Sequence, residues 1–329
     1  MAVTDHPPAS WPTTADRSSG GRPGRVLCVG HAAHDSVYRI ESFPARPTKV
    51  PALALDRSIG GMAANAACAI SALGGRATYW GPLGDDETAA LIRAEFAQAG
   101  VDASGAIRVV GAQSSQSAII VDATGERLII SQRGTALEAG AQDLVARPIE
   151  ADVVLVDVRW NAGAELAAQR GRSLGLPVVL DGEMGNAALL RRLVPLADHL
   201  IFSEPGFAEW IGRPVPMEAV AEDLAALVVA GATLAAVTHG ERGVVFCVRG
   251  HCGHLAAVPV KAVETLGAGD VFHGAYCLAL AEGSSLEAAL RFAAAAAALK
   301  CSRSGGRAGL PHRAEVDALA RLREPAIIG

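Results

Sequence analysis

The sequence predicts an α/β fold in which a mostly parallel central sheet is flanked by helices and a small β-sheet acts as a lid. Short apolar strands alternate with helical stretches from residue 151 onward, which implies a parallel sheet covered by helices. Half of the 329 residues are hydrophobic, enough for a sizeable core. Polar, strand-like segments at about 36–58 and 105–131 have the character of inserted strands that cover a cleft.

The chain is expected to divide into a short tail and one domain. Residues 1–24 are rich in Pro, Ser, Thr, Arg and Gly, a composition that predicts a disordered N-terminal tail. Residues 25–329 are expected to form a single α/β domain, and its lid is discontinuous because the two lid segments are separated in sequence.

Strands are expected where apolar or alternating residues are bounded by turn residues, and helices where small apolar residues recur over ten or more positions. In order along the chain, the first half is expected to contain a strand at 25–30, a helix at 62–73, a strand at 76–80, a helix at 86–98 and a hairpin at 114–131 that turns at 123–125.

The second half has the regular alternation of a doubly wound sheet, whose ligands bind beyond the carboxyl ends of the strands. In order, it is expected to contain strands at 152–157, 177–181, 199–203 and 234–239, a hairpin at 243–260, and helices at 271–281, 286–300 and 312–323.

Charge and hydropathy narrow the class of protein. The net charge is −5 and no basic stripe stands out, which argues against a nucleic-acid partner. No uninterrupted apolar run has transmembrane length, and the N-terminus has no signal-peptide core, so no membrane partner and a cytoplasmic location are expected.

Most of the cysteines lie in apolar runs and are expected to be buried, reduced thiols. The segment around Cys247, Cys252 and His254 lacks a standard zinc spacing and is predicted to be a hairpin that turns at Arg249-Gly250. The six positions are Cys28, Cys68, Cys247, Cys252, Cys277 and Cys301.

The most informative stretch is Gly267-Ala268-Gly269-Asp270, directly before an apolar helical run. A helix start leaves backbone N–H groups without partners, and small residues let an anion approach them. A carboxylate at Asp270 would repel a resting phosphate, but it suits a base that deprotonates an attacking hydroxyl. The alternative is a glycine-rich turn in which Asp270 only stabilises the helix end.

Three further features are expected at the same edge of the sheet. Asp35 follows the first strand, Gly60-Gly61 begins a helix that carries Asn65, and Arg159 follows a central strand. Each is weak alone, because an Asp after a strand is often a helix cap and a Gly pair is usually a turn. Their joint occurrence predicts a ligand site.

The motifs Gly60-Gly61-x-x-x-Asn65 and Thr265-x-Gly267-Ala268-Gly269-Asp270 resemble the two signatures of the ribokinase (PfkB) carbohydrate-kinase family. The resemblance covers essentially residues 25–323 and implies a ribokinase-like fold and ATP-dependent phosphorylation of a sugar hydroxyl. It implies that Asp270 is the base and that the amides of Gly267, Ala268 and Gly269 stabilise charge in the transition state. Asp35, Gly60, Gly61 and Asn65 would then bind the sugar.

The same resemblance implies a nucleotide site and a homodimer. Mg²⁺ would be held mostly through water. The family's Asn-x-x-Glu motif is replaced by Ser203-Glu204-Pro205-Gly206. Within this segment, Glu204 is the one acidic side chain that could act near magnesium. Exposed edges of the lid are expected to pair with a second subunit. The nucleotide-binding residues implied are Ser203, Thr238, Gly240, Gly267, Gly269 and Lys300.

A closer resemblance is to the bacterial 6-deoxy-6-sulfofructose kinases, which phosphorylate O1 of a ketose with a sulfonate at C6. It is carried by segments such as 114–122, 157–160 and 267–274. It implies sulfonate contacts from Lys49, Ser131 and Arg159. Arginine suits such a group because its planar fork matches an oxyanion. A solvated Lys49 and a structural pairing of Arg159 with Asp157 are the alternatives.

The same residues and motifs are compatible, to different degrees, with other functions. A kinase for another ketose, a sugar phosphate or ribose fits the same motifs, and a nucleoside kinase fits less well because the lid strands are poor in aromatic residues. A non-catalytic sensor would have no use for Asp270. A dinucleotide-binding oxidoreductase is disfavoured because residues 30–35 lack the G-x-G-x-x-G turn.

Overall fold

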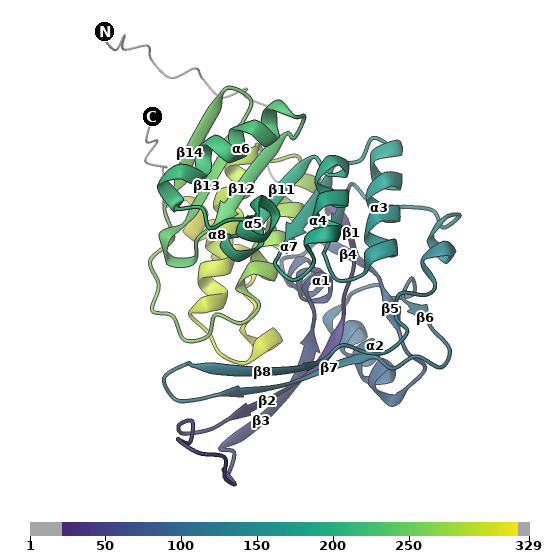
Figure 1. The fold of residues 1–329 in the computed structure, drawn as a ribbon, viewed down its shortest axis with the longest axis vertical. Helices are drawn as coiled ribbons and strands as arrows, with labels where there is room; N and C mark the ends of the chain where they lie inside the picture. Colours follow the sequence, from purple (N-terminus) through teal and green to yellow (C-terminus); the bar gives the residue numbers. More distant parts are fainter. Residues whose placement is uncertain (1–21, 322–329) are drawn as a thin grey trace.

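The computed structural model describes residues 22–321, and its centre is an eight-stranded sheet (Figure 1). The strand order is β14-β13-β12-β11-β10-β9-β1-β4, and all neighbours from β12 to β4 are parallel, whereas β13 and β14 are antiparallel. The strands are β1 (Arg25–Val29), β4 (Arg76–Trp80), β9 (Val153–Val156), β10 (Val178–Gly182), β11 (His199–Ser203), β12 (Leu234–Thr238), β13 (Val244–Val248) and β14 (His251–Leu255).

Helices cover both faces of this sheet because its strands are apolar on both sides. Val153 and Leu155 of β9 enter one core cluster, and Val154 and Val156 enter the other. The first face carries α1 (Met62–Ala72), α7 (Ala268–Ala281) and α8 (Leu286–Cys301), with α2 (Glu87–Ala99) and α9 (Arg313–Arg321) beside them; the second carries α3 (Asn161–Ser173), α4 (Ala187–Leu193), α5 (Glu204–Ile211) and α6 (Val220–Val229).

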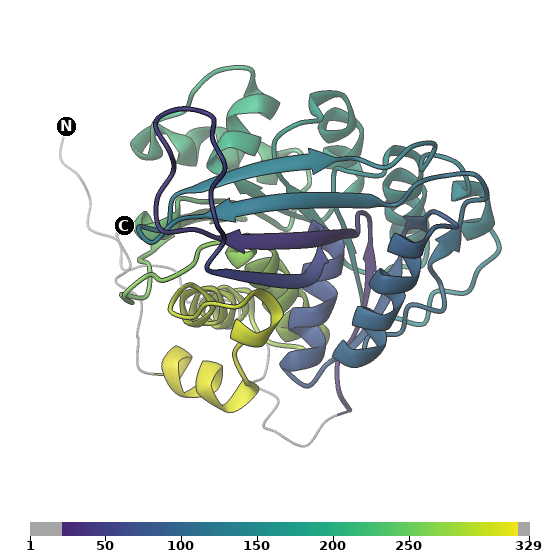
Figure 2. The same ribbon diagram turned by 90° about the horizontal axis from the view of Figure 1, so that it is seen from below.

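A separate four-stranded sheet forms the predicted lid and lies across the carboxyl ends of the parallel strands (Figures 1 and 2). Its order is β3-β2-β7-β8, in which β2 and β7 are parallel and the two outer pairs are antiparallel. The strands are β2 (Ala33–Arg39), β3 (Ala54–Gly60), β7 (Ser115–Val121) and β8 (Arg127–Gln132). The predicted α/β fold with a β-sheet lid is therefore confirmed.

The second lid segment begins at Ser115, not at about residue 105 as the sequence predicted. Residues Ile107–Arg108 form β6, which pairs with β5 (Pro82–Leu83) in a separate two-stranded sheet. The reason is burial, because Ile107 and Val109 pack into the same core cluster as Trp80 and so belong to the body.

Glycines define one element boundary that differs from the prediction and one turn that agrees with it. Helix α7 begins at Ala268 and not at 271, since Gly267 caps it with a left-handed φ of 74°. Strand β14 begins directly after the turn at Gly250, whose φ is 77°. No helix within residues 22–321 is long and apolar enough to cross a bilayer.

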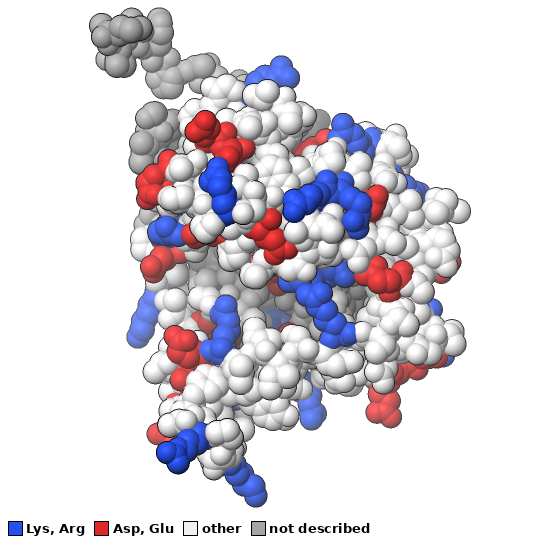
Figure 3. Space-filling model, in the orientation of Figure 1, with Lys and Arg blue, Asp and Glu red and all other residues white. Residues whose placement is uncertain are grey.

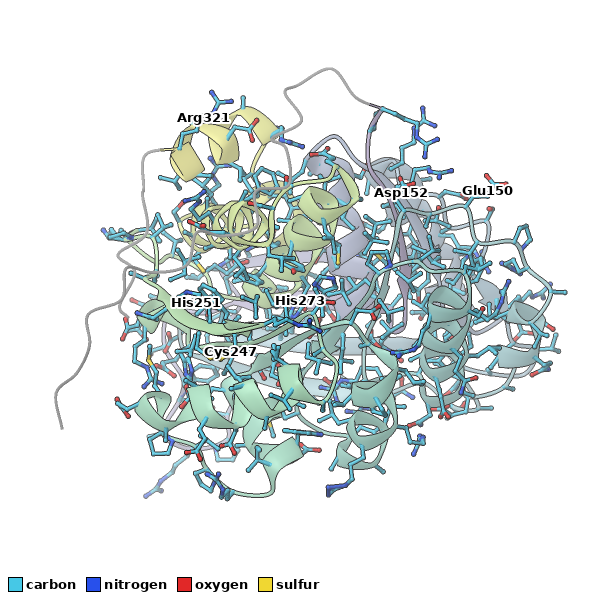
Figure 4. The ribbon with its side chains drawn as sticks, turned by 90° about the horizontal axis from the view of Figure 1, so that it is seen from above. Glu150, Asp152, Cys247, His251, His273 and Arg321 are labelled. Carbon is cyan, nitrogen blue, oxygen red and sulfur yellow. A yellow bond between two sulfur atoms is a disulfide. The ribbon has the colours of Figure 1, made fainter. Side chains whose placement is uncertain are left out.

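The predicted ends of the chain are only partly described. Residues 1–21 of the expected tail, and 322–323 of the expected last helix, lie outside the described residues. Arg22 and Arg25 both contact the carboxylate of Asp152, and the backbone carbonyl of Gly24 accepts a hydrogen bond from Arg76. Figure 4 labels Asp152 beside Glu150, at the end of the sheet opposite to the lid.

The expectation of reduced thiols is wrong for one pair of cysteines. Cys247 of β13 and Cys252 of β14 form a disulfide, because the hairpin register places them directly opposite each other, with Cα atoms 4.0 Å apart (Figure 4). Neighbouring His254 contacts the Arg242 carbonyl. The other four cysteines are free thiols, of which Cys28, Cys68 and Cys277 are buried and Cys301 is half-buried.

Candidate active site

The amino end of α7 is open, as the small residues of Gly267-Ala268-Gly269 predicted. A Cβ placed on Gly269 would meet nothing within 4 Å, so this turn faces free space. The backbone N–H groups of Gly269 and Asp270 have no acceptor among residues 22–321. Unpaired N–H groups at the positive end of a helix dipole form a site for an anion.

Asp270 lies in the first turn of α7 and is held by Asn65 of α1. The Asn65 side-chain amide donates a 2.7 Å hydrogen bond to Asp270 Oδ2. The two signatures, about 200 residues apart in sequence, therefore meet at one point. The contact also explains why an amide is suited to position 65: it fixes the carboxylate without neutralising it.

The surroundings of Asp270 raise the pKa of its carboxyl to about 7. Removal from water is the main cause, and the nearby Asp181 carboxyl adds to it, whereas the Asn65 hydrogen bond lowers the pKa. Asp181, at the end of β10, is 4% exposed, and its own pKa is raised well above the usual range by burial. His273 lies in the interior of the body (Figure 4), with its Nδ1 3.5 Å from Asp181 Oδ2.

Asp35 projects from β2 of the lid over the Gly60-Gly61 pair. A Cβ at position 60 would lie 1.9 Å from Asp35 Oδ2, and one at Gly61, whose φ is 95°, would lie 2.5 Å from the His31 carbonyl. Only glycine permits this approach. Asp35, Asn65 and Gly267 line one narrow pocket between lid and body, and burial raises the pKa of Asp35 to about 6.

Asp157 connects the central sheet to this site, although it is fully buried. Its carboxylate accepts backbone hydrogen bonds from His31, Ala63 and Arg159. It therefore fixes the loop after β1, the first turn of α1 and the loop after β9. The predicted alternative that Arg159 pairs with Asp157 holds only for the Arg159 backbone, not for its guanidinium.

One row of residues on the inner face of the lid is polar throughout. The strand register places Ser58, Asp35, Ser117 and Ser131 side by side. Ser117 Oγ and Ser131 Oγ are 3.5 Å apart. The predicted substrate residues Asp35 and Ser131 thus share one face of the lid, which is turned to the body.

Arg159 lines a cavity of about 210 Å³ at one end of the lid, together with Arg133, which the sequence analysis missed. Arg133 lies two positions after Ser131, so strand alternation puts both on the same face of the lid. The two-residue spacing from Ser131 was the signal that could have identified Arg133. It shows which face of the lid Arg133 shares only once the register of the hairpin is known. Figure 3 shows basic side chains gathered along the hollow between the lid and the body.

Lys49 lies far from these groups. It belongs to the exposed loop between β2 and β3, which extends beyond the Arg39 end of β2 (Figure 1). The cavity with Arg159 lies at the other end of the lid, next to Ser115, which pairs with Ala33. Seven strand residues span roughly 20 Å, so one chain does not bring Lys49 and Arg159 together.

The predicted nucleotide residues Ser203, Thr238 and Gly240 lie at the carboxyl ends of β11 and β12. Ser203 is paired with Thr238, and its hydroxyl caps α5 and donates to Glu183 at 2.9 Å. A Cβ on Gly240 would meet open space. This is the edge at which a doubly wound sheet binds its ligands.

Glu204 is already paired with two side chains of its own chain. It contacts His239 at 3.1 Å and Arg242 at 2.6 Å, and the His239 and Arg242 contacts hold the pKa of its carboxyl below the usual range. Glu183, by contrast, accepts hydrogen bonds from the Ser203 hydroxyl and the Met184 amide and has no ion pair within residues 22–321. Within residues 22–321, no group of three or more His, Cys, Asp or Glu side chains is arranged to hold a metal ion.

Lys300 is buried and paired with Glu264, which also contacts the lid. Glu264 accepts from Lys300 at 3.1 Å, from Arg39 of β2 at 2.9 Å, and from the amides of Gly305 and Gly306. Arg127 of β8 also reaches the body, with a 2.6 Å hydrogen bond to Thr265. These contacts fasten the lid to the segment before α7.

A helix amino end beside a carboxylate, under a lid that excludes water, defines the class of phosphoryl-transfer enzymes acting on small molecules. The chain matches the pfkB family of carbohydrate kinases over residues 24–313, and it belongs to that family. It is therefore an ATP-dependent carbohydrate kinase, as the two signatures implied.

Sequence relatives agree with this membership. The chain is 28% identical to the ribokinase of Haemophilus influenzae over 263 residues, which cover 78% of this chain and 85% of that enzyme. It is 29% identical to the ATP-dependent ribose-1-phosphate kinase of Halopiger xanaduensis over 286 residues, which cover 86% and 94%.

Solved structures share the fold over nearly the whole chain. A candidate ribokinase from Agrobacterium tumefaciens is 37% identical, with a TM-score of 0.84 over 92% of this chain and 100% of that one. The Arabidopsis thaliana ribokinase complexed with ribose and ATP is 26% identical, with a TM-score of 0.78 over 91% and 99%.

Proposed function

We propose that this kinase transfers the γ-phosphoryl group of ATP to a sugar hydroxyl that Asp270 deprotonates. One observation carries the proposal: a carboxylate with a pKa near 7 is fixed by Asn65 beside the open amino end of α7. A base works best when its pKa is close to the working pH. The arrangement provides both a proton acceptor and a site for the transferring phosphoryl group.

In the proposed reaction, the sugar hydroxyl loses its proton to Asp270 as its oxygen attacks the γ-phosphorus and the bond to the ADP oxygen breaks. The amides of Gly267, Gly269 and Asp270, which are free within the described residues, stabilise the charge on the phosphoryl oxygens, whereas the Ala268 amide, which the sequence also assigned to this role, donates to the Thr265 carbonyl. Gly60, Gly61, Asp35 and Asn65 hold the sugar. The lid, fastened through Glu264, excludes water that would otherwise take the phosphoryl group.

ATP would lie along the edge formed by Ser203, Thr238 and Gly240, with its phosphates towards α7. Gly269 and Gly240 leave space for it. Lys300 would act on this side through Glu264, because its ammonium group is paired there.

Mg²⁺ would neutralise phosphate charge, and it would be held by phosphate oxygens and water, since the described residues form no protein cage for it. The sequence left the organiser of the magnesium water open and assigned a role near magnesium to Glu204 at most. Its carboxylate is occupied by His239 and Arg242. Glu183, which faces Ser203, has no ion pair among the described residues and suits that role better.

The proposed sugar is 6-deoxy-6-sulfofructose, and the product is its 1-phosphate. The support is a cation, Arg159, in a cavity that lies across Asp157 from Asn65 and Asp270. Asp35 and Ser131 line the path between them on the lid. The alternatives are kinases for a sugar phosphate, such as fructose 6-phosphate or tagatose 6-phosphate, and for neutral ketoses or ribose.

We further propose a homodimer formed through the lid. The outer face of the lid, which is turned to the viewer in Figure 2, carries the exposed apolar side chains of Tyr38, Leu55, Leu128 and Ile130. An exposed apolar sheet face of this kind is typical of an interaction surface. A contact between Lys49 and the anionic end of the sugar would require the lid of a second chain.

A substrate panel tests the proposal. The enzyme with ATP and Mg²⁺ is incubated with sulfofructose, fructose, fructose 6-phosphate, tagatose 6-phosphate, ribose and adenosine, and ADP release is measured. The highest kcat/KM is expected with sulfofructose. Turnover of fructose 6-phosphate without turnover of sulfofructose would overturn the substrate, and no turnover of any compound would favour a non-catalytic sensor.

A further inference from the structure

We propose that Arg133 of the lid and Arg159 of the body together bind a terminal oxyanion of the sugar, either sulfonate or phosphate, and that Arg133 determines specificity. The inference rests on the proposed sugar-kinase function and adds to it the residue that recognises the anionic end. It assigns that recognition to a pair of guanidinium groups on opposite sides of the cleft.

The two guanidinium groups converge although their residues follow strands of different sheets, Arg133 after β8 and Arg159 after β9. A Cβ on Gly185 would lie 2.6 Å from Arg159 Nη1 and 3.7 Å from Arg133 Nη2, so both groups lie within 4 Å of one point. Neither guanidinium has an ion pair or hydrogen bond within residues 22–321. Two like charges this close repel each other unless an anion lies between them.

The cavity between them offers further donors. Trp160 lines it, is 1% exposed, and its indole N–H has no acceptor among the described residues. His31 also lines it, and its pKa is lowered to about 4 by burial and by the charges of Arg159 and Arg133. A neutral His31 adds a hydrogen-bonding group without adding repulsion.

One carboxylate, Glu138, also lines the cavity. It is engaged with Asn161, whose side-chain amide donates to it at 2.7 Å. The cavity therefore contains two unpaired cations and one carboxylate that already has a partner. This balance favours an anionic ligand, and the planar forks of two arginines match the oxygens of a sulfonate or phosphate.

The position of the cavity relative to Asp270 fits the two ends of one sugar. Asp157 binds the backbones of His31 and Arg159 on the cavity side and of Ala63 on the other. Ala63 lies in the first turn of α1, and the same helix carries Asn65, which fixes Asp270. A ketose with its reacting hydroxyl at Asp270 would direct its far end past Asp157 to the two arginines.

The test compares Arg133→Met with Arg133→Lys and with Arg191→Met, an exposed arginine of α4 that matches the charge loss at a remote site. For each variant, kcat/KM is measured with sulfofructose, fructose 6-phosphate and neutral fructose. Arg133→Met is expected to lose about 10- to 100-fold with anionic sugars, mainly through KM, because this contact binds substrate and transition state alike. Turnover of fructose should stay within about twofold, and Arg133→Lys should recover part of the loss.

Calorimetric titration of anionic sugar without nucleotide separates this inference from the kinase proposal. Wild-type binding that Arg133→Met weakens supports the inference even if the enzyme turns nothing over. Equal losses with fructose and with anionic sugars, or an unchanged affinity for both anionic sugars, would overturn it. A sulfonate ligand would bind equally from pH 5.5 to 7.5, whereas a phosphate ligand would bind more tightly as its second proton, with a pKa of about 6, is lost.

Discussion

At the scale of single residues, the Asp270 carboxyl must be ionised to accept a proton. Burial and Asp181 raise its pKa to about 7, and Asn65 opposes them. We therefore expect kcat/KM for sulfofructose to fall about tenfold per pH unit below pH 7 and to level off above it. Asn65→Ala removes the interaction that lowers this pKa, so its acidic limb should move to higher pH. Movement to lower pH would contradict the assignment.

The raised pKa of Asp270 also makes the stability of the folded protein depend on pH. A carboxyl whose pKa is raised on folding stabilises the protein below its unfolded pKa, and this contribution is lost as the pH rises through about 7. The site is therefore least favourable to folding at the pH at which the base is active. Burial of the Asp270 carboxylate therefore costs folding stability at a position where the carboxylate serves catalysis.

Motif residues and spatial neighbours differed in how well the sequence predicted them. Asp270 and Asn65 could be placed because each lies near the start of a helix at the carboxyl edge of the sheet. Asp35 could be placed because it comes soon after β1 in sequence, although it lies within the lid strand β2. Arg133 could not, because its position depends on the register of β7 and β8. Lys49 was grouped with Arg159 only by resemblance, and the length of the lid separates them.

At the scale of elements, the lid is fastened to the body through Arg39 of β2 and Glu264. Arg39→Ala should raise the KM for sugar about tenfold, the equivalent of roughly 1.4 kcal/mol, and increase ATP hydrolysis without sugar, because the lid excludes water less well. The fold should persist, since Glu264 keeps Lys300. Both effects can be followed by ADP release.

Arg57→Ala provides the matched control, because Arg57 lies in β3 of the same lid on its outer face. It should leave both KM and ATP hydrolysis unchanged. Equal effects of the two substitutions would mean that loss of a lid charge, and not the contact with Glu264, is responsible.

Element positions were more predictable than element partners. Strands β4 and β11 match the expected bounds, because buried parallel strands are apolar runs that end at turn residues. The error at 105 arose because the buried β6 and an inserted lid strand have similar patterns. The disulfide was missed because spacing alone does not reveal that Cys247 and Cys252 face each other, although the predicted hairpin contained that information.

At the scale of the whole molecule, the outer face of the lid determines the proposed assembly. The wild-type protein should sediment at twice its 33.6 kDa mass. Leu128→Glu with Ile130→Glu should yield monomers, because charges on this face oppose burial against a second sheet. Analytical ultracentrifugation provides the measurement, and Leu174→Glu, at an exposed apolar position on the body, is the control. A monomeric wild type, or a double variant that stays dimeric, would contradict the interface.

In the proposed mechanism, the fold, the lid and the open amino end of α7 together place a sugar hydroxyl between Asp270 and ATP. Asp270→Asn tests this most directly, because the amide keeps the shape and the contact with Asn65 but cannot accept the proton. We expect kcat with sulfofructose to fall by about 10²–10⁴, with the ATP dissociation constant within about threefold of wild type by calorimetry. Turnover within threefold of wild type would contradict the account.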